Sequence, residues 1–106
     1  MSLQIAFVFH FNQHTSEYAV VANRACYRGL LNVLRAHPKL KFNLHLSGTL
    51  LRALNWFDSE TLDLVRAGLA DGQFELLGST YAQNIPYASH DWDNAQQIAA
   101  HRHVLK

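Results

Sequence analysis

The hydrophobic and polar positions of the chain fall into short segments that predict strands and helices in turn. Residues 4–11 are apolar, β-branched and aromatic, and the segment has the length of a buried strand. From about residue 18 to residue 37 the apolar residues recur on one side of a helix. Pro38 ends this helix, because a proline disfavours helical backbone in the residue before it. Segments 41–46 and 73–78 are the second and third predicted strands.

Two further helices are expected between the second and third strands. A short one opens at Ser47 and runs to about Trp56. The next covers 59–70, with Asp58 as its expected N-cap residue. Gly72 ends that helix, because glycine readily adopts the left-handed backbone that closes a helix.

A long polar loop, 79–90, follows the third strand, and a last helix begins near residue 91 and is expected to be helical still at Lys106. The alternation of strands and helices predicts an α/β fold with a parallel sheet and right-handed crossovers, within a single domain of residues 1–106. Three strands leave both sheet edges open, so we expect self-association through them. The open edges and the final helix indicate a truncated piece of something larger.

Each predicted strand has one apolar face and one small or polar face, because side chains alternate across a strand. Outer helices are expected to cover the apolar faces, so that the polar faces converge on one cavity. Burying so many polar groups without partners would cost about 1–3 kcal/mol each, so a hydroxyl-rich ligand, water or a network must satisfy them. The polar residues expected to line this cavity are His10, Asn12, His45, Ser47 and Glu75.

Composition narrows the class of function. Hydrophobic residues make up 49% of the 106 residues, which is enough for a core, and the formal net charge is +1. Lys and Arg are spread along the chain, so no nucleic-acid partner is expected. No apolar stretch approaches the length of a membrane span, and no secretory signal precedes the first strand. One cysteine, Cys26, suits a reducing compartment, so we expect a cytoplasmic protein.

The residues that follow the first strand resemble a known signature. His10 to His14 read His-Phe-Asn-Gln-His. This resembles the His-x-His-Gln-Pro motif of glycoside hydrolase family 57, the family of certain α-amylases and 4-α-glucanotransferases. His10 matches the first histidine and Gln13 the glutamine, while Asn12 replaces the second histidine and His14 the proline.

A second signature of that family, a glycine followed by a glutamate in a strand, matches Gly72 and Glu75. The segments 46–51, 79–86 and 93–105 also resemble the family, in the right order. The resemblance therefore covers nearly the whole chain.

This resemblance implies the first three βα units of an incomplete (β/α)7 barrel. The family hydrolyses or transfers α-glucans with retention, using a glutamate after the fourth strand and a later aspartate. The chain ends before the fourth strand, so it is expected to carry no catalytic residue, to need no cofactor and to be inactive alone. The residues expected to bind an α-glucan or oligosaccharide are His10, Gln13, Glu75, Asn12, His45, Ser47 and Tyr81.

Two other functions remain open. The chain could be a non-catalytic remnant that binds glucan or accompanies another chain, or a domain like the metal-dependent polysaccharide deacetylases. The spacing of His10 and His14 differs from that of a helical zinc pair, so no metal site is expected. His101 and His103 are expected at the surface.

Overall fold

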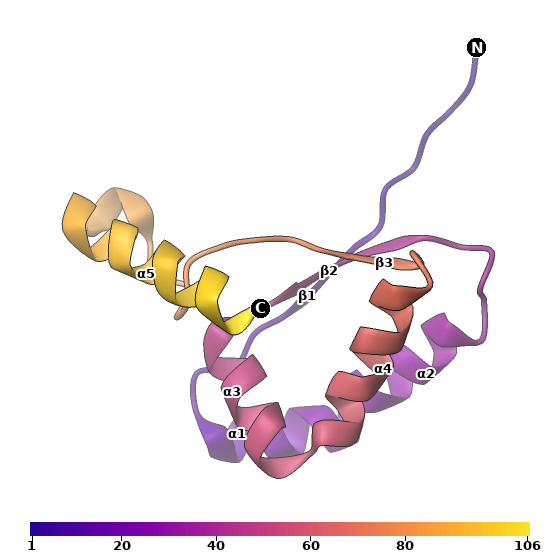
Figure 1. Ribbon diagram of the computed structural model, residues 1–106, viewed down its shortest axis with the longest axis horizontal. Coiled ribbons are helices and arrows are strands. Elements are labelled where there is room, and N and C mark those ends of the chain that lie inside the picture. The colour runs from indigo at the N-terminus through magenta and orange to yellow at the C-terminus, as the bar shows by residue number, and fades with distance from the viewer.

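The computed structural model describes all residues 1–106 and has one three-stranded parallel sheet with helices between the strands (Figure 1). The strands β1 (Val8–Phe11), β2 (Phe42–Leu46) and β3 (Phe74–Leu76) lie side by side in chain order. The predicted α/β fold with a parallel sheet is thus confirmed. The helical segments are α1 (Ser16–Ala22), the π-helix η1 (Asn23–Tyr27), α2 (Arg28–Arg35), α3 (Gly48–Phe57), α4 (Ser59–Ala70), the 3-10 helix η2 (Pro86–Ala88) and α5 (Asp91–Val104).

Helices α1 to α4 lie on one side of the sheet, and α5 extends away from one end of it (Figure 1). The covered side is the apolar one: Phe42, Leu44 and Leu46 of β2 are all buried in the core. Leu31 of α2 and Leu50 of α3 are also without exposed surface. Each such leucine contributes about 2 kcal/mol by leaving water, which fixes the helices to this face.

The first strand is shorter than predicted. We expected it over 4–11, but β1 begins at Val8. β1 pairs only with β2, and β2 begins at Phe42, so residues 4–6 have no neighbouring backbone to pair with. The backbone pairing with β2 therefore starts at Phe7, whose carbonyl accepts from Asn43 N–H.

The predicted first helix is confirmed with shifted ends. It runs without a break through α1, η1 and α2, from Ser16 to Arg35. The Thr15 hydroxyl caps it by accepting from the N–H of Tyr18. Its middle turn is widened, and Asn23 at the start of that turn is buried and bonded to other helices.

The prediction that the Asp58 side chain caps α4 is wrong. Asp58 stands at the N-cap position, but its carboxylate makes no capping bond. It instead accepts from Asn23 Nδ2 at 2.8 Å and from Arg28 at 3.4 Å. The backbone at Asp58 therefore starts the helix, while its side chain ties α4 to η1 and α2.

The last helix stops at Val104, two residues before the end we expected. Leu105 and Val104 turn toward the core there and are half-buried. No helix in the protein is both long and apolar enough to cross a membrane.

Candidate functional site

Polar side chains gather on the uncovered face of the sheet, near the carboxyl ends of the strands. The register pairs Val8 with Asn43 and Asn43 with Glu75, and it pairs His10 with His45 one step further along. In-register neighbours in a parallel sheet project to the same side. We call this side, carrying these five residues, the open face.

His10 and His45 form the centre of the open face. Their rings are stacked, with centroids 4.7 Å apart and planes 10° apart. Their Nδ1 atoms lie 2.8 Å apart, which is a hydrogen-bond distance, so one ring donates and the other accepts. His10 is exposed while His45 is buried, so only His10 presents a ring edge outward.

The second nitrogen of His45 is also occupied. Its Nε2 lies 2.7 Å from Ser79 Oγ and 3.2 Å from Gln83 Nε2, and both come from the loop after β3. Burial, and then the charges of His10 and His101, lowers the pKa of His45 below its usual 6.5. His45 is therefore held neutral, with both nitrogens bound inside the protein.

His101 was expected at the surface, and this prediction is wrong. It is 1% exposed, and its Nε2 donates to the Leu46 carbonyl at 2.8 Å. Its Nδ1 accepts from the N–H of Ser79 at 3.2 Å. This one side chain of α5 therefore joins β2 to the loop after β3.

A sequence signal for His101 does exist. Asn94, Gln97 and His101 recur at helical spacing on α5 and form its least exposed polar side. Gln97 accepts from the backbone N–H groups of Ala82 and Tyr81, through its side chain and its carbonyl respectively. The polar side of α5 thus packs on the loop after β3.

Sequence reasoning also missed Gln83. Its φ of 57° lies in the left-handed region, which non-glycine residues seldom adopt. The Gln83 amide donates to Ser79 Oγ at 2.9 Å as well as contacting His45. Holding a residue in such a conformation costs of order 1–3 kcal/mol, so these bonds offset the strain.

Asn12 and Gln13 follow β1 directly, as expected from the sequence. The Asn12 Oδ1 atom is buried without any hydrogen-bond partner, so this acceptor is unsatisfied inside the protein. Gln13 donates to the Tyr27 hydroxyl at 3.1 Å, and its carbonyl accepts from Thr49 at 2.8 Å. These contacts fix the loop that carries the first signature.

Ser47 and Tyr81 make contacts that hold the start of α3 in place. Ser47 is fully buried, and its hydroxyl caps α3 by accepting from the N–H of Leu50 at 3.3 Å. The ring of Tyr81 lies against Gly48, leaving no room for a Cβ there. The Tyr81 carbonyl accepts from Gly48 N–H at 2.8 Å. Nothing in these surroundings supports our expectation that Ser47 contacts a ligand.

Glu75 is exposed on β3 and belongs to none of the ion pairs of the chain. It lies two strands and two residues from His10, roughly 12 Å between Cα atoms at ordinary strand spacing and rise. A ligand that contacts both side chains is therefore an extended molecule rather than a small ion.

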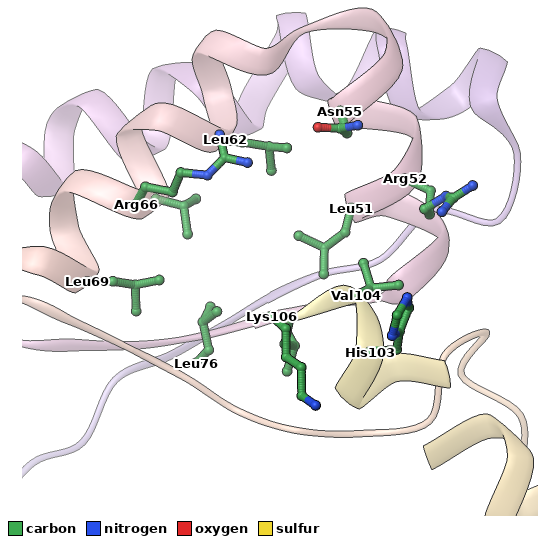
Figure 2. A pocket seen from close by; sticks show the side chains of 12 residues that line it. Leu51, Arg52, Asn55, Leu62, Arg66, Leu69, Leu76, His103, Val104 and Lys106 are labelled. Atoms are coloured by element: carbon green, nitrogen blue, oxygen red, sulfur yellow. The ribbon is translucent and has the colours of Figure 1, made fainter. Parts of the chain in front are cut away.

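A hollow lined mainly by apolar side chains lies elsewhere, on the helix-covered side. Figure 2 shows this cavity of about 580 Å³, with Leu51, Leu62 and Leu69 at its walls. The last residues of the chain, including Lys106, close one side of it. None of the predicted binding residues lines it.

Two tryptophan side chains lie at the surface of the protein. Trp56 and Trp92 would pack in the core if the aromatic residues of these helices faced inward, but they are 83% and 67% exposed.

No group of three or more His, Cys, Asp or Glu side chains is placed to hold a metal ion.

Comparison with known proteins adds an independent line of evidence. The sequence model of a family described as glycosyl hydrolase family 57 matches residues 6–106. An α-amylase of Pyrococcus horikoshii is 30% identical over 100 residues, which cover 90% of this chain. A 4-α-glucanotransferase of Thermococcus litoralis is 29% identical over the same length.

The fold agrees with these sequence matches. The crystal structure of the Thermococcus litoralis 4-α-glucanotransferase superposes with a TM-score of 0.84 at 27% identity and covers 95% of this chain. The chain spans only 16% of the amylase, 15% of the glucanotransferase sequence and 17% of the crystallised chain.

Proposed function

Because this chain belongs to glycosyl hydrolase family 57, we propose that it forms part of the α-glucan-binding surface of a retaining hydrolase or transglycosylase. The observation that carries this proposal is the open face, where His10 and Glu75 are exposed and not covered by helices. The names of the amylase and the glucanotransferase support the α-glucan as ligand.

The chemistry of the open face suits a sugar. Each hydroxyl of a glucan both donates and accepts, and the open face offers both kinds of group. The carboxylate of Glu75 accepts, and the exposed His10 ring has a free nitrogen. The ligand named here is extended, as the separation of His10 and Glu75 requires.

We further propose that residues 1–106 bind glucan without breaking it. Retaining hydrolysis needs two carboxyl groups about 5–5.5 Å apart. Glu75 is the only acidic residue within the strands. Four others form ion pairs with arginines among the helices: Asp58, Glu60, Asp63 and Asp71. The nucleophile and the acid/base are therefore assigned to other parts of the enzyme, within a barrel to which these three strands belong.

A titration followed by NMR tests the proposal. The 106-residue protein is titrated with an α-1,4-linked glucose oligomer and, as a control, with a β-1,4-linked oligomer of equal length. We expect shift changes for the α-linked oligomer at His10 and Glu75, and no release of reducing ends. Shift changes confined to the cavity of Figure 2, or none at all, contradict the proposal.

The lack of a second carboxylate on the strands also favours a non-catalytic glucan-binding role. The two functions differ in whether the polypeptide encoded by the complete reading frame turns over α-glucan. Turnover of α-glucan by the polypeptide made from that frame supports the enzyme, whereas binding without turnover supports the accessory role.

Two expectations about the setting of the chain stay proposals. The edges of β1 and β3 have no partner strand, which supports self-association. A single sharp monomer peak in sedimentation, with a cooperative melt, would contradict it. The free and exposed Cys26 supports a reducing compartment, and we propose the cytoplasm.

A further inference from the structure

We propose that His45 is a positioning residue, which fixes the proton of His10 on the outward nitrogen Nε2 and so makes His10 a hydrogen-bond donor to a ligand. The inference rests on the proposed glucan site for the identity of the ligand. The position of the proton follows from contacts within the chain alone.

The tautomer of His101 is fixed by backbone groups. A carbonyl can only accept, so His101 Nε2 carries the proton that it donates to Leu46. A backbone N–H can only donate, so His101 Nδ1 is bare where it accepts from Ser79. Both nitrogens of the His101 ring are thus bound to backbone groups, and the ring holds Ser79 beside His45.

The Nε2 atom of His45 accepts hydrogen bonds from the loop after β3. The side-chain amide nitrogen of Gln83 is a donor only, so the His45 Nε2 atom 3.2 Å away accepts. Ser79 Oγ accepts from the Gln83 amide, so the 2.7 Å contact is made by the Ser79 hydroxyl, which donates its one hydrogen to His45 Nε2 in place of the Thr80 carbonyl 2.9 Å away. A neutral imidazole that accepts at Nε2 carries its proton at Nδ1.

The position of the proton on His45 in turn sets the tautomer of His10. His45 Nδ1 carries the proton and lies 2.8 Å from His10 Nδ1, so His10 accepts there. The proton of neutral His10 is then on Nε2. His10 is exposed and its ring is stacked on His45, so this N–H is held in one orientation before a ligand arrives.

Preorganisation of this kind favours one ligand atom over others. An N–H held in place donates to a hydroxyl or ring oxygen, and no rotamer freedom is lost on binding. The strained backbone of Gln83 fits this role, because the residue is held where its amide meets His45 and Ser79.

Long-range ¹H–¹⁵N spectra of the histidine rings test the proposal directly. In the unaltered 106-residue protein we expect His10 to be protonated at Nε2 and bare at Nδ1, and His45 to show the reverse. A mixture of tautomers, or a proton at His10 Nδ1, overturns the proposal without any variant being made.

Two variants then separate positioning from mere packing. His45→Asn keeps an amide donor near the place of Nδ1, and His45→Phe keeps the ring but removes the donor. We expect the Nε2–H form of His10 to persist in the first and to become mixed in the second. Affinity for the α-1,4-linked oligomer should fall about fivefold in His45→Phe and much less in His45→Asn, as for the loss of one aligned hydrogen bond.

The control is His103→Asn, an exposed histidine that should leave both the tautomer and the affinity unchanged. Equal effects of the two His45 variants overturn the proposal. If the tautomers are as stated but no α-glucan perturbs His10, the glucan proposal fails while the positioning of His10 by His45 stands.

Discussion

The rings of His10 and His45 are stacked at 4.7 Å across two neighbouring strands, with Nδ1 facing Nδ1 at 2.8 Å. Both rings cannot be cations at this distance without strong repulsion. The pair therefore works as a hydrogen bond only while at least one ring, and by burial His45, is neutral. This relationship makes the stability of the fold depend on pH.

We predict that stability decreases as the pH falls below about 6.5. The pKa of His45 is lowered in the folded chain, so the unfolded chain binds more protons below its own value of 6.5. The stabilisation is fully present above that value and is lost as the pH falls through the folded pKa. Melting temperatures measured between about pH 7.5 and pH 5 should show this loss, and His45→Asn should flatten the curve. A curve of unchanged slope in His45→Asn contradicts the assignment, and His103→Asn serves as the control.

Two helical glycines should respond in opposite ways to alanine. A Cβ on Gly68 would overlap the buried ring of Phe74, whereas a Cβ on Gly29 meets nothing within 4 Å. Gly68→Ala should therefore lower the free energy of unfolding by about 1–3 kcal/mol. Gly29→Ala, in α2, should raise it by about 0.5–1 kcal/mol. Urea unfolding of both variants checks the pair, and loss of stability in both, to a similar degree, speaks against the packing described.

The buried bond between Thr61 and Asn23 should matter more than its length suggests. The Thr61 hydroxyl donates to Asn23 Oδ1 at 3.0 Å, and both residues are almost without exposed surface. Thr61→Val keeps the shape but leaves the Asn23 oxygen unpaired, at a cost of about 1–3 kcal/mol. Thr61→Ser keeps the donor and should cost less. The reverse order in urea unfolding would show that shape, and not the hydrogen bond, holds α4 to η1.

Glu75→Gln should weaken glucan binding without weakening the fold. Glu75 is exposed and unpaired, so the free energy of unfolding should change by less than about 0.5 kcal/mol. A charged acceptor is lost, so affinity for the α-linked oligomer should fall about tenfold. Glu60→Gln is the matched control, because Glu60 is exposed on the helix-covered side and pairs with Arg28. Equal affinities in the two variants would remove Glu75 from the site.

The order of the elements could be predicted from sequence because apolar periodicity reports burial locally. The alternation of Phe42, Leu44 and Leu46 was sufficient for β2 and its covered face. The ends were harder, because they depend on what lies opposite: residues 4–6 have strand-like composition but no partner.

The candidate site could likewise be predicted only where its residues lie in local motifs. His10 and Gln13 belong to one short motif and Glu75 to another, so each residue is marked by neighbours a few positions away in the chain. The contacts around His45 join residues 34 to 38 positions apart, and the His101 bond to Leu46 spans 55. Such contacts depend on how a loop and a distant helix are packed, and no local pattern encodes that.

The π-helix η1 has a consequence for the alignment of the long first helix. Ala19, Asn23, Tyr27 and Leu31 are buried at intervals of four residues, and each such step overshoots a full α-helical turn by about 40°. Three steps in an ideal α-helix would carry the buried side about a third of the way around the axis. The wider turn takes back part of this rotation, so the stripe stays nearly straight. Tyr27 therefore stacks on Phe11, with ring centroids 4.5 Å apart, and its hydroxyl accepts from Gln13. The wider helical turn thus helps to position the loop that carries the first motif.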